Sequence, residues 1–173
     1  MKQEDIHISF DLETLSLESN AAIVQIGAVQ VGSSEEFNSY ISPRSAEYLG
    51  GHVDVGTINW WDRQDPQIRN TVFGGTTDIR QALADFYEWC LSLADGDINR
   101  VYLWSKGADF DCVVLKNNYE LFMEHPFNFR NNRCVRTAMH LKPLENPAPN
   151  QLAHNALEDA KYQAQFIKHA LAL

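Results

Sequence analysis

The sequence predicts an α/β domain built on a mixed β-sheet, and two patterns support this prediction. Three apolar segments follow one another near the N-terminus with short connections, which is typical of antiparallel strands. Helical and strand-like segments then alternate toward the C-terminus, which favours a sheet with helices on its faces. Because no internal repeat or interdomain linker interrupts this pattern, residues 1–173 are expected to form a single domain.

The N-terminal strands are expected at residues 6–12, 22–31 and 36–42. The second segment is a long, β-branched apolar run that suits a central strand, and the turn at 32–34 leads into the third. Glycines interrupt the stretch after Pro43, so we expect a surface loop there.

Helices dominate the remainder of the chain. Thr57 is a candidate cap for a short helix, and Asp65 with Pro66 matches the N-cap and first position of another. From 78 to about 94, apolar residues recur at i, i+3 and i+4 and predict an amphipathic helix. The other expected elements are a strand at 100–104, a helix at 109–122, a strand or short helix at 133–141, and a last helix from 156 to near the C-terminus.

The composition limits the function classes. The chain has 23 acidic and 14 basic residues and a net charge of −9. Proteins that bind along nucleic acid normally present a basic surface. Two options remain: nucleic acid is not the partner, or it is held at one end by metal ions and a few local contacts.

The sequence also limits the cellular location of the protein and the bonding state of its cysteines. No apolar run approaches the ~20 residues that span a bilayer, and the N-terminus does not resemble a signal peptide. A cytoplasmic protein without a membrane partner is therefore expected. Three cysteines without CxxC spacing argue against a disulfide framework or a zinc site.

Asp11 and Glu13 are the first candidate site residues. They lie two residues apart at the end of the first expected strand, so their side chains project from one face. Adjacent carboxylates repel each other, and a divalent cation between them and a substrate is a common reason to hold them together. The alternative is a pair of solvent-facing acids at a strand end.

Two further acids begin the helix expected at 109–122. Asp109 fits a helix cap, where its carboxylate would bind free amides and complement the helix dipole. Asp111 lies two residues further on, in the first turn, and could point toward a metal held by Asp11 and Glu13.

The last helix offers a comparable start. Asn155 followed by Glu158 is a variant of the capping box, which places Asp159 in the first turn. His154 then lies just outside the helix on a loop. An imidazole in this position suits the deprotonation of water near neutral pH.

In order and position, these motifs resemble the DEDDh group of 3′-to-5′ exonucleases. The matching motifs are Phe10-Asp11-Leu12-Glu13-Thr14, Phe110-Asp111 and His154-Asn-Ala-Leu-Glu-Asp159. This family has a ribonuclease H-like fold, so the resemblance implies a mixed sheet of five to six strands, three antiparallel and the rest parallel, flanked by helices.

Two other segments resemble one branch of the family, the phage-type and bacterial exoribonuclease-like proteins. They are Thr57-Ile-Asn-Trp60-Trp61-Asp-Arg63-Gln64-Asp-Pro66, with its Trp-Trp pair before the first long helix, and Arg133-Cys-Val-Arg136-Thr137. The chain departs from many relatives at Gly107, where they have Asn, and at Arg136, where they have Asp. These departures affect the expected substrate more than the expected reaction.

The resemblance implies the chemistry and the roles of the residues. Asp11, Glu13, Asp111 and Asp159 would hold two divalent cations, Mg²⁺ or Mn²⁺, and His154 would be the general base. The family match selects Asp111 over Asp109. Such an enzyme would release 5′-mononucleotides from the 3′ end of single-stranded RNA or DNA.

Substrate contacts are expected from Thr14, Leu15, Phe110, Trp60 and Trp61. For the tryptophans a core position is the competing interpretation, because one of the two must face inward on a short helix. The exposed member could stack on a terminal base. Leu15 could simply pack.

Cationic side chains near the motifs are the remaining candidates for substrate contacts. Lys106, Arg133 and Arg136 suit phosphate binding or a solvated surface equally well. The motifs do not encode sugar preference, base preference or processivity. Several relatives dimerise, so a homodimer is also allowed.

Two other function classes stay open. A non-catalytic nucleic-acid-binding module of this fold would be expected to lack a ligand or the histidine, and neither is missing here. A metal-dependent phosphoesterase acting on nucleotides would need the same five side chains. Substrate length separates it from an exonuclease.

Overall fold

The computed structural model describes residues 5–150 and 152–173. The strands are β1 (Ile6–Thr14), β2 (Ile23–Gln30), β3 (Glu36–Tyr40), β4 (Val101–Ser105) and β5 (Arg133–Cys134). The helices are α1 (Pro43–Leu49), α2 (Val55–Trp61), α3 (Pro66–Phe73), α4 (Ile79–Leu93), α5 (Asp111–Glu120), α6 (Val135–Leu141) and α7 (Ala156–Leu171).

Within the described residues, the strands form one five-stranded sheet in the order β3-β2-β1-β4-β5. The first three strands pair antiparallel, whereas β4 is parallel to β1 and β5 is parallel to β4. The predicted mixed α/β sheet is confirmed. The segment at 133–141, predicted as a strand or a short helix, contains both.

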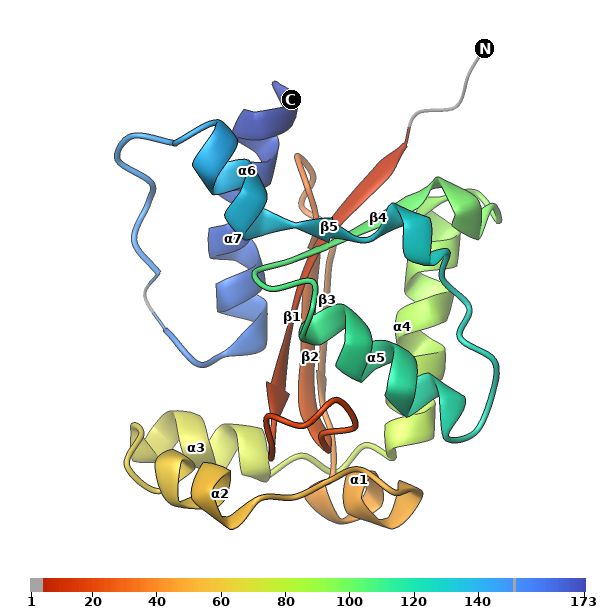
Figure 1. Cartoon of the computed structure of the whole chain (residues 1–173), viewed down its shortest axis with the longest axis vertical. Coiled ribbons are helices and arrows are strands. Elements are labelled where there is room, and N and C mark those ends of the chain that lie inside the picture. The colour runs from red at the N-terminus through yellow and green to blue at the C-terminus, as the bar shows by residue number, and fades with distance from the viewer. Residues whose placement is uncertain (1–4, 151) are drawn as a thin grey trace.

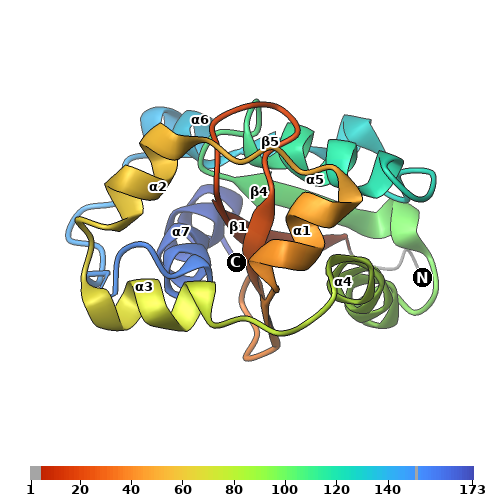
Figure 2. The same ribbon diagram turned by 90° about the horizontal axis from the view of Figure 1, so that it is seen from below.

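Helices cover the sheet on both faces. Figures 1 and 2 show α6 and α7 on one side and α4 and α5 on the other, while α1, α2 and α3 gather at the end toward which β1 runs. The larger core lies on the α4 side, where Phe10 of β1 packs near Phe86 of α4. A smaller core includes Trp104, Val135 and Phe166. None of the described helices is long and apolar enough to cross a membrane.

The side chains of β1 alternate between these faces. Ile8 and Phe10 are fully buried in the larger core. Ser9 and Asp11 point the other way, because the Ser9 hydroxyl donates to the Ala160 carbonyl at 2.8 Å and Asp11 accepts a hydrogen bond from a side chain of α7. The period of two in the strand therefore places the acids on the face that α7 covers.

Gly27 allows α7 to approach the sheet closely. It lies opposite Asp11 in the antiparallel register of β1 and β2. A Cβ atom at Gly27 would lie 2.1 Å from the Leu157 nitrogen and 2.3 Å from the Ala156 carbonyl carbon. Only glycine leaves this space free, so the first turn of α7, with Asp159, can lie against the strand pair.

The region after Pro43 differs from the prediction. It is not an irregular loop, because Pro43 is the first residue of α1 and the Ser42 hydroxyl caps that helix. The helix α2 begins before Thr57: Asp54 is its cap and accepts a hydrogen bond from the Thr57 amide at 2.7 Å. The glycines at 50, 51 and 56 led to the prediction of a loop, although the cap residues of both helices were present in the sequence. Asp65, in contrast, caps α3 as predicted.

The start of α5 also differs from the prediction. The helix begins at Asp111, and Asp109 is exposed rather than serving as the cap. The Gly107 carbonyl accepts hydrogen bonds from the Phe110 and Asp111 amides, at 2.7 and 3.2 Å. This backbone turn, with Gly107 at φ 137°, replaces the expected carboxylate cap.

Candidate active site

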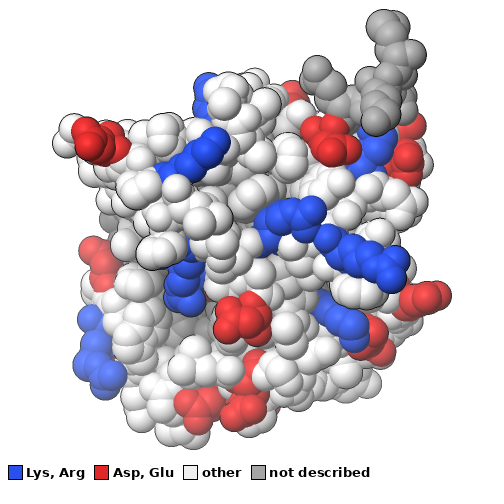
Figure 3. Space-filling model, turned by 45° about the horizontal axis from the view of Figure 1, so that its top comes forward, with Lys and Arg blue, Asp and Glu red and all other residues white. Residues whose placement is uncertain are grey.

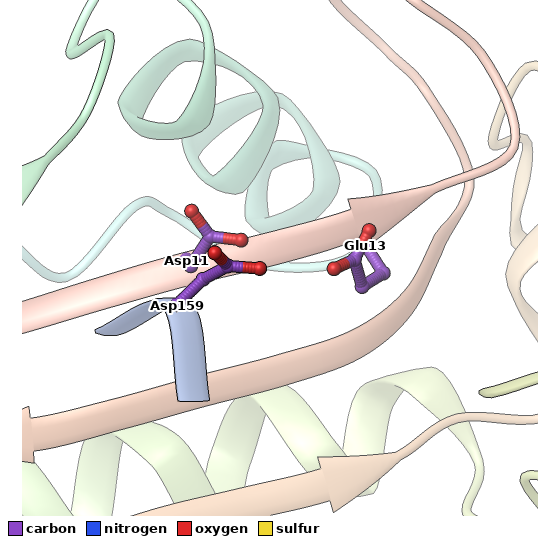
Figure 4. Close-up of side chains that lie close together, drawn as sticks. All are labelled: Asp11, Glu13 and Asp159. Carbon is purple, nitrogen blue, oxygen red and sulfur yellow. The ribbon is translucent and has the colours of Figure 1, made fainter. Parts of the chain in front are cut away.

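Three of the predicted acids meet beside the end of β1. Asp11 and Glu13 come from that strand and Asp159 from the first turn of α7, and their nearest carboxylate oxygens all lie within 4.8 Å of one another. Figure 4 shows the three carboxylates directed toward a common space. Oxygen atoms in such an arrangement fit a hard divalent cation.

The carboxylates of this cluster repel one another when no cation is bound. Burial raises the pKa of Asp11 well above its ordinary value, and the charges of Asp111, Glu13 and Asp159 raise it further. Burial, together with Asp159 and Asp111, raises the pKa of Glu13 to about 8. A bound divalent cation would favour the ionised forms and remove this repulsion.

Asp111 lies next to this cluster but is not one of the three acids that meet there. Its carboxylate is buried at the first position of α5, and burial raises its pKa to about 6. Hydrogen bonds from the Leu12 amide and the Ser105 hydroxyl oppose that rise, as does the charge of Arg136. The Asp111 carboxylate is close enough to Asp11 for its charge to raise the pKa of Asp11.

The loop before α7 orients Asp159. The Asn150 amide donates to Asp159 Oδ1 at 2.7 Å, and the backbone amide of His154 donates to Oδ2 at 2.9 Å. Both carboxylate oxygens are therefore held by the loop that carries the predicted base. Burial raises the pKa of Asp159, while the His154 amide, the His154 side chain and Asn150 lower it. Asn150 lies outside the sequence motifs, and no pattern around it indicated this role.

Gln163 performs the equivalent function for Asp11. It lies one turn after Asp159 on α7, is 2% exposed, and donates from Nε2 to Asp11 Oδ1 at 2.8 Å. Side chains that hydrogen-bond to metal-ligating groups typically fix their orientation. The i, i+4 spacing from Asp159 was the available sequence signal, because it places both side chains on one helix face.

His154 stands at the edge of the cluster. Its backbone is in the left-handed region at φ 67°, and the residue is exposed. The imidazole ring meets Trp60 of α2 edge-on, with ring centroids 4.8 Å apart. The position on a loop before α7 agrees with the sequence prediction, and Asn155 caps the helix as predicted.

A cavity of about 520 Å³ opens beside Glu13. Of the predicted substrate contacts, Thr14, Phe110 and both tryptophans line it, together with Asp54 and Arg63, which sequence reasoning did not select. Arg63 lies two residues after the Trp-Trp pair, which was the available signal.

One of the two tryptophans faces inward and the other is partly exposed, as expected for a short helix. Trp61 is 1% exposed and its indole donates to the Thr14 carbonyl at 3.0 Å, whereas Trp60 is partly exposed at the cavity. Leu15, by contrast, is buried in the larger core and does not line the cavity.

We predict that Asn150→Ala weakens divalent-metal binding about ten-fold, because Asp159 loses one of its two hydrogen-bond donors. The Mn²⁺ concentration that gives half-maximal nuclease rate or half-maximal thermal stabilisation measures this effect. Asn70→Ala, on the exposed face of α3, is the matched control and should behave as wild type. Equal metal affinity in both variants would contradict the role of Asn150.

Comparison with known proteins gives a consistent result. Residues 6–171 match the family described as the 3′-5′ exoribonuclease Rv2179c-like domain. Comparison with curated protein sequences gives no match.

Two solved structures share the fold. Cell-death related nuclease 4 (CRN-4) has a TM-score of 0.63 and 17% identity, covering 98% of this chain and 64% of that chain. The nuclease domain of 3′hExo, a DEDDh family member solved with rAMP, has a TM-score of 0.63 and 16% identity. The match covers 99% of this chain and 94% of that chain. The chain thus spans less than two thirds of the length of CRN-4.

These findings agree with the sequence prediction of a DEDDh-type fold with a divalent-metal site. The family match covers almost the whole chain, and an acidic cluster lies where the motifs placed it. The prediction of a metal-dependent 3′-5′ exonuclease domain is confirmed at the level of the family. The chain belongs to the Rv2179c-like family of 3′-5′ exoribonuclease domains.

Proposed function

We propose that this protein removes 5′-mononucleotides from the 3′ end of single-stranded nucleic acid, with RNA as the first substrate to test and DNA as the second. The carboxylate cluster of Asp11, Glu13 and Asp159 beside a cavity of about 520 Å³ carries this proposal. A cavity of this size accommodates one nucleotide, and its contact with Glu13 brings a terminal phosphodiester to the acids.

The proposal assigns Mg²⁺ or Mn²⁺ to the site, two ions in all, held by Asp11, Glu13, Asp111 and Asp159. Four carboxylates and no thiolate form a donor set that suits these hard cations. When bound, such ions stabilise negative charge at a reacting phosphorus and generate a nucleophile from water at neutral pH. Gln163 and Asn150 keep two of the carboxylates oriented.

His154 is the proposed general base. Its ring is exposed at the edge of the cluster, and the edge-on contact with Trp60 limits the positions that it can occupy. The imidazole takes a proton from the attacking water, a reaction for which a histidine near neutral pH is suited.

The cavity holds the terminal nucleoside in this proposal. Trp60 and Phe110 present aromatic surfaces to the base, and base stacking on such rings tolerates different sequences. Thr14, the last residue of β1, lines the cavity, and its hydroxyl donates to the Ser16 carbonyl at 2.8 Å. Leu15 supports this region by packing beneath it.

We test the proposal with a time course on matched 5′-labelled RNA and single-stranded DNA in Mg²⁺ or Mn²⁺. Stepwise shortening is expected, and Asp111→Ala should lower the rate at least about 10³-fold, because a ligand is lost. His154→Ala should lower the rate by about 10² to 10⁴-fold. Asp109→Ala is the matched control for Asp111, since that neighbouring acid is exposed.

Four outcomes would contradict parts of the proposal. Full activity in Asp111→Ala would contradict the role of Asp111 as a metal ligand. An unchanged pH profile of the rate in His154→Ala would contradict the role of His154 as the general base. Cleavage of a circular strand as fast as a linear one would exclude exonuclease action. If only mononucleotides or dinucleotides react, the protein is a nucleotide phosphoesterase instead.

The remaining sequence predictions stay predictions. They are the cytoplasmic location, the single-domain organisation and a homodimer. Light scattering of the purified protein measures the oligomeric state.

A further inference from the structure

Residues 126–142 form a basic segment in an acidic protein. The segment contains four arginines or lysines and no aspartate or glutamate, whereas the whole chain has 23 acids and 14 bases. The four are Arg130, Arg133, Arg136 and Lys142. A local excess of positive charge in such a chain produces a local reversal of the surface potential.

The charges of this segment are not neutralised by ion pairs. In the part of the chain that the structure describes, ion pairs involve Arg69, Arg80, Arg100, Lys116 and Lys161. Among the described residues, none of the four cations of the segment has a carboxylate oxygen within the 4.0 Å that defines those pairs. Arg130 and Arg136 are exposed and present their charge to solvent.

One end of the segment reaches the candidate active site. Arg136 is in the first turn of α6, and a Cβ atom placed on Gly107 would lie 3.3 Å from one of its guanidinium nitrogens. The guanidinium therefore lies over the turn that leads to Asp111. Glycine at this position leaves room for the arginine. Lys106, exposed at the end of β4, flanks the same turn.

The segment leads away from that end along the edge of the sheet. β5 is parallel to β4, with Arg133 opposite Trp104 and Cys134 opposite Ser105. Because β5 runs toward Arg136, Arg133 lies further from the site, and Arg130, before β5, lies further still. Figure 3 shows Lys and Arg side chains across the middle of one face of the molecule, with acidic side chains mostly around them.

An exposed aromatic ring accompanies the cations at the far end. Phe129 is 68% exposed, and the Arg130 guanidinium lies 5.5 Å from the centre of its ring. Arg133 is fixed over the Tyr102 ring at 4.8 Å. Isolated exposed apolar residues are common and need no function. An aromatic ring next to unpaired cations, however, matches surfaces that stack bases and bind phosphates of single strands.

We propose that Lys106, Arg136, Arg133, Arg130 and Phe129 form a track that binds the upstream nucleotides of a single strand whose 3′ end lies at the carboxylate cluster. The phosphates of the strand contact the cations in this order, and a base stacks on Phe129. The inference rests on the proposed function and specifies how a protein with a net charge of −9 holds a polyanion.

The test compares Arg136→Glu and Arg130→Glu with Arg44→Glu. Arg44 is the matched control for Arg136, because both are exposed, form no ion pair with another described residue, and occupy the second position of a seven-residue helix. Each enzyme is assayed with a dinucleotide and with an RNA of about twelve nucleotides, a length within the range of single-strand sites.

We expect Arg130→Glu to raise KM for the longer RNA on the order of five-fold, equivalent to about 1 kcal/mol at an exposed ionic contact, and to leave the dinucleotide unaffected. Arg136→Glu should raise KM for both substrates. The slope of log affinity against log salt should become shallower by about 0.7 for each lost phosphate contact. Phe129→Ala should raise KM for the longer RNA without changing the salt slope.

Two results would overturn the track. One is the same KM for the longer RNA in Arg130→Glu and Arg44→Glu, and the other is an equal loss with both substrates in Arg130→Glu. Failure of the proposed function is visible separately, because the wild-type enzyme would then release no mononucleotide from either RNA. Fluorescence anisotropy of the labelled longer RNA would still report whether the track binds it.

Discussion

Glu13→Gln is expected to lower exonuclease activity at least about 10³-fold and, in the metal-free protein, to raise the melting temperature. The activity falls because an anionic ligand becomes neutral. The stability rises because Glu13 is buried beside Asp159 and Asp111, which repel its charge. A functional site of this kind carries a stability cost that a bound cation offsets.

The pH dependence follows from the direction of the shift. The pKa of Glu13 is about 8 in the folded protein, against an ordinary value of 4.5. The folded state therefore binds this proton more tightly than the unfolded state does. Ionisation of Glu13 destabilises the fold progressively as the pH rises from about 4.5 to about 8, and the full effect is present above pH 8.

Thermal denaturation in a chelator measures this effect. At about pH 9 we expect Glu13→Gln to melt roughly 4–8 °C above wild type, corresponding to about 2 kcal/mol, and the difference should shrink toward pH 5. Excess Mn²⁺ should stabilise wild type more than the variant. Glu18→Gln, at an exposed position after β1, serves as the control. A variant that melts below wild type at high pH would show that repulsion in the cluster is not the dominant effect.

The sequence was sufficient for the parts of the fold that depend on local patterns. Alternation placed the acids of β1 on one face, and helical periodicity identified α4. Asp65 and Asn155 were correctly predicted as caps, because short polar side chains before helical segments have this role. The prediction of Asp109 as a helix cap was wrong, because the Gly107 carbonyl already accepts hydrogen bonds from the amides at the start of α5.

The sequence motifs predicted the acidic residues of the candidate site. Asp11, Glu13 and Asp159 lie together, and Asp111 lies beside them, close enough for its charge to raise the pKa of Asp11. The residues that orient these acids were harder to predict, because Gln163 is 152 residues from Asp11, and Asn150, nine residues before Asp159, lies in a loop outside the motifs. Asn150 is an ordinary loop residue and Gln163 an ordinary helix residue until α7 is placed against β1.

Gly27→Ala is expected to destabilise the protein by roughly 3 kcal/mol or more and to lower activity at least about 10²-fold. The added methyl group would meet backbone atoms of Ala156 and Leu157 at 2.1 to 2.5 Å, so a rotamer change cannot relieve the clash. The first turn of α7 must move away from β2. Asp159 moves with that turn, and its distance from Asp11 and Glu13 increases.

Thermal denaturation and the Mn²⁺ dependence of the nuclease rate measure the two effects of Gly27→Ala together. Gly32→Asn is the control, because Gly32 lies in an open turn at φ 83° and asparagine tolerates that conformation. We expect Gly32→Asn to retain activity and metal affinity. If Gly27→Ala retained wild-type stability and bound Mn²⁺ equally well, the close approach of α7 would not be what assembles the carboxylate cluster. Weak Mn²⁺ binding in a folded Gly27→Ala protein would show that the spacing between helix and sheet sets the metal affinity.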